Sequence, residues 1–161
     1  MILVFGKTGQ VATELQRIGD VVALGRDQAD LANPAACADA IRTHAPRAVI
    51  NAAAYTAVDR AEEVEALATV INGDAPTAMA RACEELGIPL IHISTDYVFD
   101  GTGVAPWHPH GPTSPQNAYG RSKLAGEIGI RNSDAVHVIL RTSWVVSAHG
   151  ANFVKTMLRL S

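Results

Sequence analysis

The stretch Met1-Ile2-Leu3-Val4-Phe5-Gly6-Lys7-Thr8-Gly9-Gln10-Val11-Ala12 decides the fold of this chain. Its five leading apolar residues are typical of a buried parallel strand, and a helix is expected to open at Ala12. Between them, Gly6 permits a tight turn, Gly9 lets the backbone approach a pyrophosphate, and Ala12 keeps the helix close to the sheet. The stretch therefore predicts a dinucleotide-binding turn, with an ordinary strand–helix turn as the alternative.

The rest of the chain alternates short apolar strands with helices. Further strands are expected at residues 21–24, 48–54 with its exit, 90–94 and 136–141, and helices at residues 35–44, 62–70, 75–86, the region after 119, and 152–160. Repeated β–α units with nearly continuous apolar strands predict an α/β fold of the Rossmann type. We expect one domain, residues 1–161, with a doubly wound parallel sheet and helices on both faces.

Composition excludes several function classes. Of the 161 residues, 48% are hydrophobic and 18% are charged, which is enough apolar surface for one substantial core. The formal net charge of -3 provides no basic footprint for nucleic acid, and no apolar run is long enough to span a membrane. Cys37 and Cys83 are isolated, which suits free thiols in a reducing compartment. Cytoplasm is the expected location.

Tyr119 and Lys123 stand four residues apart in Tyr119-Gly120-Arg121-Ser122-Lys123. In a helix their side chains share one face, one turn apart. A free tyrosine has a pKa of about 10, and a cation alongside stabilises the phenolate and lowers that pKa. The pair predicts a proton donor to a developing alkoxide, with a solvated surface pair as the alternative.

Polar residues gather where three of the expected strands end. Residues 51–56, 94–97 and 142–144 contain most of them. Because ligands bind at the carboxyl ends of strands in such sheets, this pattern predicts an active site at one edge of the sheet.

Five motifs, in this order along the chain, resemble those of the extended short-chain dehydrogenases/reductases. They are the glycine turn at residues 6–12 and residues 51–54, 94–101, 115–127 and 141–145. More narrowly, the opening at residues 6–10, the pair Thr95-Asp96 and residues 152–159 resemble the dTDP-4-dehydrorhamnose reductases. This resemblance implies NADPH-dependent reduction of the 4-keto group of dTDP-4-dehydro-L-rhamnose to dTDP-L-rhamnose, a step of nucleotide-sugar biosynthesis.

The resemblance also implies roles for single residues. Tyr119 would donate the proton, and Lys123 would lower the pKa of Tyr119 and bind the nicotinamide ribose. The hydroxyl of Thr95 would polarise the carbonyl. Asp96 would tune proton affinity or contact the sugar, and Trp144 would pack near the sugar. Substrate contacts are thus implied at Thr95, Asp96, Tyr119 and Trp144.

Cofactor contacts are implied along the same edge of the sheet. They fall on Gly6, Gly9, Gln10, Val11, Arg26, Asp30, Leu31, Ala54, Tyr55, Thr56, Tyr119 and Lys123. Arg26 stands at the end of the second strand, where enzymes that prefer NAD usually carry an acid, so NADPH is favoured. Asp27 is close enough to keep NADH as the alternative.

Other functions stay open at this point. One is a non-catalytic dinucleotide-binding subunit like the regulatory subunit of methionine adenosyltransferase; another is a nucleotide-sugar epimerase or dehydratase. His108 and His110 lack further ligands, so no metal site is expected. A homodimer is a possible assembly.

Extended reductases of this kind run to about 300 residues, as two-region folds require. This chain has 161. We expect the C-terminal substrate-binding region to be absent from it, and residues 1–161 alone to reduce substrate poorly.

Overall fold

The computed structural model describes residues 1–161, and its centre is a sheet of five parallel strands in the order β2-β1-β3-β4-β5. In chain order the elements are β1 (Ile2–Phe5), α1 (Gln10–Ile18), β2 (Val21–Leu24), α2 (Pro34–His44), β3 (Ala48–Asn51), α3 (Val58–Ala61), α4 (Glu65–Thr69), a π-helical turn (Val70–Asp74), α5 (Ala75–Leu86), β4 (Leu90–Thr95), a 3-10 turn (Asp96–Val98), α6 (Ala118–Arg131), β5 (His137–Thr142) and α7 (Phe153–Leu160). The predicted Rossmann-type sheet is confirmed.

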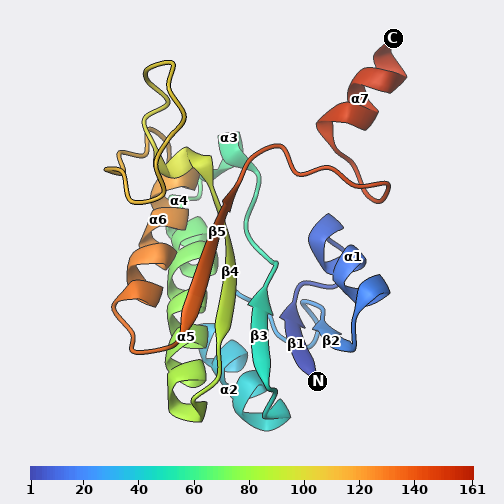
Figure 1. The fold of residues 1–161 in the computed structure, drawn as a ribbon, viewed down its shortest axis with the longest axis vertical. Coiled ribbons are helices and arrows are strands. Elements are labelled where there is room, and N and C mark those ends of the chain that lie inside the picture. Colours follow the sequence, from blue (N-terminus) through green and yellow to red (C-terminus); the bar gives the residue numbers. More distant parts are fainter.

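Helices cover both faces of the sheet, as predicted, but unequally. Helices α2, α5 and α6 pack side by side on one face, and α1 lies on the other face beside β1 and β2 (Figure 1). Alternate residues of β1 serve the two layers. Leu3 and Phe5 join the main core with Met79 of α5, whereas Val4 meets Ala12 of α1.

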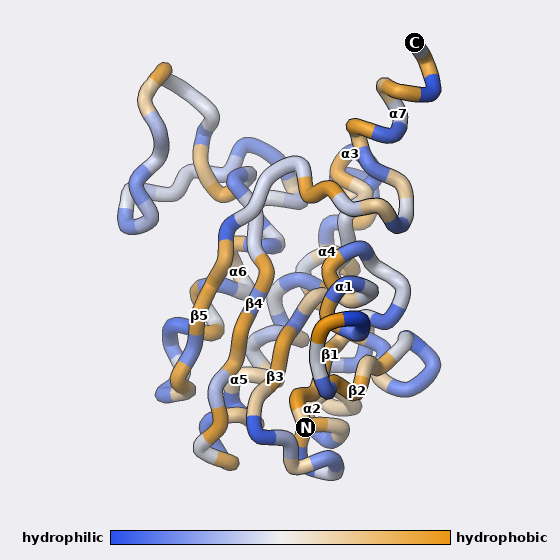
Figure 2. The backbone as a smooth tube through the Cα atoms, turned by 45° about the vertical axis from the view of Figure 1, so that its right-hand side comes forward, coloured by the Kyte–Doolittle hydropathy of each residue, from blue (hydrophilic) through white to orange (hydrophobic).

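The strands are the most hydrophobic segments of the chain (Figure 2). The edge strand β5 nevertheless leaves Val138 and Leu140 about half exposed, because α1 extends over β1 and β2 only. No helix in the structure has both the length and the apolar character that a membrane crossing requires.

Local signals in the sequence account for most helix boundaries. Asn33 and Asn117 cap α2 and α6 by accepting hydrogen bonds from backbone N–H groups three residues later. Pro34 occupies the first position of α2, where no N–H is needed. Gly87 ends α5 in the left-handed conformation, with a φ of 64°.

One predicted helix, residues 62–70, is confirmed only from Glu65 onwards. Residues 62–64 form a turn after α3, the helical residues begin at Glu65 in α4, and the π-helical turn follows at Val70–Asp74. The buried amide of Asn72, inside that turn, accepts from the backbone N–H of Tyr55 at 2.8 Å and donates to the carbonyl of Tyr55 at 3.0 Å. A tertiary contact of this kind leaves no periodic trace in the sequence.

The glycine turn has the geometry that its spacing predicts. Gly6 has a φ of 101°, and a Cβ atom there would stand 3.3 Å from the backbone of Ala52. Glycine is therefore required both for the left-handed conformation and for close approach to the exit of β3. Helix α1 begins at Gln10, two residues before the predicted start at Ala12.

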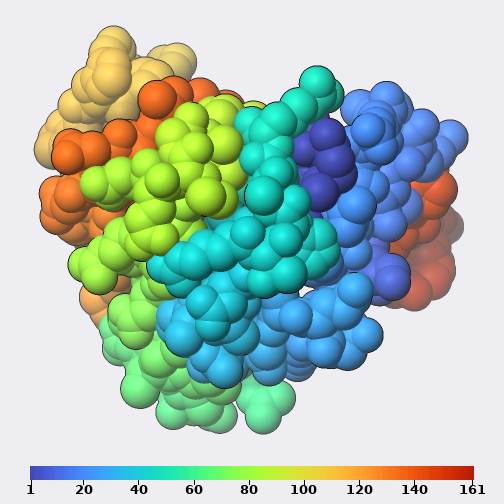
Figure 3. Space-filling model, turned by 90° about the horizontal axis from the view of Figure 1, so that it is seen from below, coloured from blue at the N-terminus to red at the C-terminus, as the bar shows by residue number.

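The two ends of the sheet differ. Figure 3 looks at the end where the strands begin, and the segments coloured from blue to green pack tightly against one another there. At the other end, residues 100–115 and 143–152 rise as long loops above the strands (Figure 1). The carboxyl end of the sheet is therefore where a ligand site can form.

Candidate active site

A cavity of about 620 Å³ opens at the carboxyl ends of β3, β4 and β5. Its walls include Ala52–Ala54 after β3, Ser94–Tyr97 at the end of β4, Thr142–Val145 at the end of β5, and Tyr119 and Lys123 of α6. The three polar strand exits that the sequence singles out thus meet in one cavity. Thr56 and Trp144 also line it.

Tyr119, Thr95 and Asp96 form the polar centre of this cavity. The hydroxyl of Thr95 donates to Asp96 Oδ1 at 3.2 Å and accepts from the backbone N–H of Tyr97 at 3.2 Å. The rings of Tyr119 and Tyr97 meet edge to face, with centroids 5.5 Å apart. These contacts hold the phenol and the Thr95 hydroxyl on the same wall.

The acidity of Tyr119 departs from the expectation. Burial raises the pKa of the phenol, contact with the Thr95 hydroxyl partly offsets that rise, and the negative charge of Asp96 adds to it. The lowering expected from Lys123 stays a prediction, because burial is the first cause acting on this pKa in the structure. A phenol that stays protonated at neutral pH is nonetheless suited to donating a proton.

Lys123 is held by β4. Only 1% of the side chain is exposed, and Nζ donates to the carbonyl of Ile93 at 2.7 Å. Nζ also lies 3.2 Å from Nε2 of the buried His92. Burial lowers the pKa of Lys123 to about 8, and the negative charge of Glu127 acts in the opposite direction.

Two polar residues near the site, Asn72 and Glu127, had no predicted role. Asn72 donates to the hydroxyl of Ser122 at 2.9 Å and so braces α6 from the π-helical turn. Glu127 is fully buried on the same face of α6 as Lys123. In the sequence, the spacing of four residues between Lys123 and Glu127 could have indicated that Glu127 lies on the same face of α6. No sequence pattern indicates the role of Asn72.

The glycine turn leaves the start of α1 open to an anion. Gly9 provides no side-chain cap, and a Cβ there would have only one neighbour within 4 Å, the Ala52 carbonyl at 4.0 Å. The first-turn N–H groups of α1 therefore have no side-chain partner at this cap. Such a terminus, next to a glycine-lined approach, is the site that pyrophosphates use.

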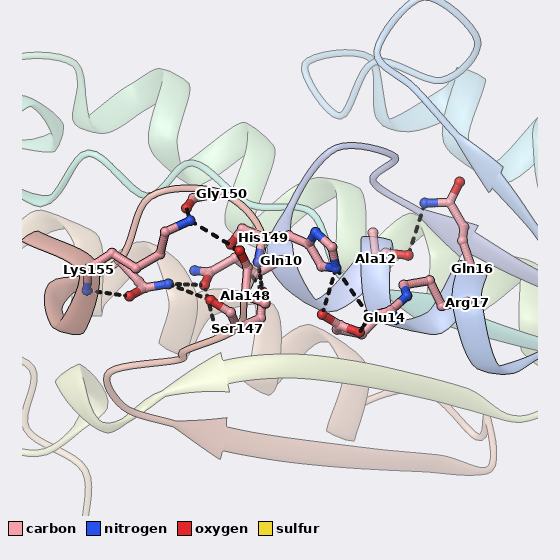
Figure 4. A network of polar contacts seen from close by, with 11 residues as sticks. Gln10, Ala12, Glu14, Gln16, Arg17, Ser147, Ala148, His149, Gly150 and Lys155 are labelled. Carbon is pink, nitrogen blue, oxygen red and sulfur yellow. Dashed lines mark hydrogen bonds and ion pairs between the residues drawn. The ribbon is translucent and has the colours of Figure 1, made fainter.

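The side chain of Gln10 hydrogen-bonds to the segment that follows β5. Its Oε1 accepts from the backbone N–H of Ser147 at 3.0 Å and from Asn152 Nδ2 at 3.0 Å. Close by, His149 lies 3.4 Å from the carboxylate of Glu14 (Figure 4). Any contact of Gln10 with a phosphate would therefore come from its backbone. Val11 lies in a separate hollow of about 220 Å³.

Most of the predicted cofactor residues do not line the cavity. These are Gly6, Gly9, Gln10, Val11, Arg26, Asp30, Leu31 and Tyr55, whereas Ala54, Thr56, Tyr119 and Lys123 line it.

Gly6 connects the cavity to the end of β2, where Arg26 lies. Gly6 contacts Ala52 on one side, and its N–H donates to the carbonyl of Leu24 at the end of β2 at 3.0 Å. The exposed side chain of Arg26 follows two residues later. Gly6 thus links the exit of β3 to the end of β2, along the carboxyl ends of the strands.

The contacts of Asp30 and Leu31 within the fold limit how each can meet a ligand. Asp30 accepts from the backbone N–H of Ala32 at 2.9 Å, and Leu31 is buried in the main core. The Leu31 side chain is therefore part of the packing, and only its backbone and Asp30 can face a ligand.

Trp144 is 74% exposed and has a φ of 52°, which is rare for a bulky residue. Its ring packs against Phe153 with centroids 4.8 Å apart. Because Trp144 lines the cavity and is largely exposed, its ring lies where the cavity opens to solvent. In the loop opposite, the rings of His108 and His110 lie 5.6 Å apart, and the backbone N–H of His110 donates to His108 Nδ1 at 3.2 Å.

The chain matches the family described as RmlD substrate binding domain over residues 1–161. It is 47% identical to dTDP-4-dehydrorhamnose reductase of Salmonella typhimurium and 48% identical to that of Burkholderia thailandensis, over 99% of this chain in each case. It spans only 56% and 55% of those relatives, about half their length.

A solved structure has the same fold. The dTDP-4-dehydrorhamnose reductase of Bacillus anthracis in complex with NADP is 35% identical and superimposes with a TM-score of 0.94. The match covers 99% of this chain and 58% of that one.

Proposed function

This chain belongs to the RmlD substrate binding domain family, and from that premise we propose that it is the dinucleotide-binding part of an NADPH-dependent dTDP-4-dehydrorhamnose reductase. The reaction would be reduction of the 4-keto group of dTDP-4-dehydro-L-rhamnose to the alcohol. The names of the relatives from Salmonella typhimurium and Burkholderia thailandensis support this substrate.

The observation that carries the proposal is the cavity in which Thr95 and Tyr119 share one wall. A carbonyl oxygen between these two hydroxyl groups would accept hydrogen bonds from both, and these bonds strengthen as negative charge develops. Tyr119 would then give its proton to the oxygen, and Thr95 would keep the oxygen in place. In this structure the single proton of the Thr95 hydroxyl points at Asp96, 3.2 Å away, so the hydroxyl would rotate to turn that proton to the substrate oxygen when the carbonyl binds.

The bound nicotinamide would supply the hydride to the carbonyl carbon. Residues of this chain fit such a cofactor: the uncapped start of α1 suits a pyrophosphate, and Ala52–Ala54 form a small-residue wall between it and Tyr119. Lys123, Ala54, Tyr55 and Thr56 would contact its middle and its ribose. Trp144 would cover the sugar of the substrate.

The preference for NADPH rests on cations at the end of β2. Arg26 is exposed there, and Lys7 reaches the same corner, since its Cδ lies 3.7 Å from the Cβ position of Gly25. Both would face a 2′-phosphate. The relative from Bacillus anthracis was solved with NADP, which supports the same choice.

Cytoplasm is the proposed location. Cys37 and Cys83 are free and buried in the core, which fits a reducing compartment.

Titration with NADPH and with NADH, followed by nicotinamide fluorescence, tests the cofactor preference. We expect NADPH to bind more tightly than NADH.

Loss of absorbance from the reduced nicotinamide after addition of dTDP-4-dehydro-L-rhamnose tests the reaction. A protein of the relatives' length should turn over, and residues 1–161 alone should do so poorly. Binding without oxidation at either length would favour a non-catalytic dinucleotide-binding subunit.

A further inference from the structure

His92 stands between two hydrogen-bond donors in the interior. Its side chain is fully buried on β4, next to the register partner Asn51 on β3. Nδ1 lies 3.2 Å from Asn51 Nδ2, and Nε2 lies 3.2 Å from Lys123 Nζ. A neutral imidazole has one donor nitrogen and one acceptor nitrogen, so it cannot accept from both neighbours.

The orientation of the Asn51 amide is set by the backbone. Asn51 Oδ1 accepts from the N–H of Ala53 at 3.1 Å. A flipped amide would turn its NH2 group towards that N–H and leave two donors facing each other. The NH2 group of Asn51 therefore points at His92, and Nδ1 of the imidazole must be the acceptor.

We propose that His92 is a positioning residue for Lys123: its imidazole accepts from Asn51 at Nδ1, carries its proton on Nε2, and directs that proton at Nζ, where it favours the uncharged amine. An ammonium has only donors and would oppose the Nε2 proton, whereas an amine has a lone pair that accepts it. The amine keeps a proton for the carbonyl of Ile93, so the chain Asn51–His92–Lys123–Ile93 is then fully paired.

The charges around the pair agree with this arrangement. Burial is the first cause that holds the pKa of His92 well below its usual value, so the imidazole is neutral in either form of Lys123; the charge of the Lys123 ammonium acts in the same direction while it is present. Of the charged groups, Glu127 on α6 acts on Lys123 and favours its ammonium. Its carboxylate is shared with Arg131 and Arg141, which weakens that effect.

The proposed reaction gives this arrangement a use, and in that respect the inference rests on the proposed function. Once Tyr119 has given its proton to the substrate oxygen, the phenolate needs another. Lys123 supplies that proton as an ammonium and becomes the amine, and because the Nε2 proton of His92 stabilises the amine, the release is easier than from a free lysine. His92 would thus act through Lys123, without touching substrate.

The test is the position of the proton on His92, read from long-range ¹H–¹⁵N correlation spectra of labelled protein. The His92 signals are assigned by their loss in His92→Gln. Nε2 should carry the proton and Nδ1 should be bare. His137 serves as the internal reference for the opposite tautomer, because its Nδ1 must donate to the carbonyl of Ala135, 2.8 Å away. A proton on Nδ1 of His92 would overturn the proposal.

Asn51→Asp replaces the NH2 group by an oxygen and keeps an acceptor for Ala53. The new carboxylate can only accept, so the His92 proton should move to Nδ1, and the titration midpoint of Lys123, followed by its ¹³Cε shift, should rise. An unchanged tautomer in Asn51→Asp would contradict the proposal. If that variant does not fold, the wild-type spectrum decides alone. Neither measurement needs cofactor or substrate, so both outcomes are independent of the reductase assay.

Discussion

Glu127 and Arg141 form a two-point ion pair that ties α6 to the edge strand β5. Arg141 Nε lies 2.9 Å from Glu127 Oε1, and Arg141 Nη2 lies 2.6 Å from Oε2. Ser94 of β4 donates to the same carboxylate at 2.6 Å. Glu127 lies on α6 together with Tyr119 and Lys123. The ion pair and the Ser94 hydrogen bond therefore fix the position of α6 relative to β4 and β5, the strands that end in the cavity.

Glu127→Gln should lower the free energy of unfolding by about 3 kcal/mol, the low end for breaking a buried ion pair. The amide fills the same volume but leaves Arg141, which is only 13% exposed, without its counter-charge. Urea unfolding measures the loss. Arg131→Met is the control, since Arg131 is 44% exposed and its pair should contribute under about 1 kcal/mol. Equal losses in the two variants would argue against a central role for Glu127–Arg141.

The same carboxylate predicts a pH dependence. Burial alone would raise the pKa of Glu127, but the hydrogen bonds from Arg141 and Ser94 outweigh it and leave the pKa below its usual value. A lowered folded-state pKa stabilises the protein above the unfolded-state pKa of about 4.3, and that stability is lost as pH falls through the folded value. The stability difference between wild type and Glu127→Gln should therefore be constant near neutrality and shrink in acid. A difference that grows in acid would show the opposite sign of shift.

Tyr119→Phe should reduce the turnover of the proposed reduction by roughly 10²–10⁴-fold, the usual contribution of a positioned proton donor. Binding of NADPH should change little, because the ring stays in place. Tyr97→Phe is the matched control: it removes a hydroxyl from the ring that meets Tyr119 edge to face and should leave most activity. Near-normal turnover in Tyr119→Phe would remove this residue from the chemistry.

Arg26→Ala should weaken NADPH binding by roughly ten- to a hundredfold, as expected for the loss of about 1.5–3 kcal/mol from a hydrogen bond to a charged group. NADH lacks the 2′-phosphate, so its affinity should hardly move. Arg47→Ala removes the same charge near the start of β3, at the other end of the sheet. If Arg47→Ala weakened NADPH equally, the effect would be one of net charge and not of position.

Gly126→Ala should destabilise the protein by about 1–3 kcal/mol through overpacking, although alanine is the better helix former by about 1 kcal/mol. The new Cβ would stand 2.2 Å from the carbonyl oxygen of Asn72. This oxygen belongs to the backbone, so it cannot rotate away as a side-chain atom can. Thermal unfolding measures the effect.

Gly129→Ala provides the comparison for that variant. Its Cβ would meet a side-chain atom, Oγ1 of Thr77, at 1.8 Å. Adding Thr77→Ala should recover much of the lost stability of Gly129→Ala, and no such deletion is available for Gly126. A stable Gly126→Ala would mean that α6 and the π-helical turn are free to separate.

The strands, the glycine turn and most helix ends could be predicted because they depend on near neighbours in the chain. The run of apolar residues before Gly6 and the caps at Asn33 and Asn117 act within a few residues. The same logic missed the turn at residues 62–64 and the π-helical turn at Val70–Asp74, where Asn72 bonds to the backbone of Tyr55. It also gave no sign of the rise in the pKa of Tyr119, whose first cause is burial, a property of the packed molecule.

Sequence by itself therefore determined which residues can do chemistry and at which edge of the sheet they lie, since parallel strands bring their carboxyl ends together. Only the tertiary structure decided which of them touch. The register between strands sets Asn51 beside His92 and Ser94 beside Arg141, and α6 then lays Lys123 on the first pair and Glu127 on the second. The register of the strands and the position of α6 depend on the packing of residues far apart in the chain, so no local sequence pattern predicts them.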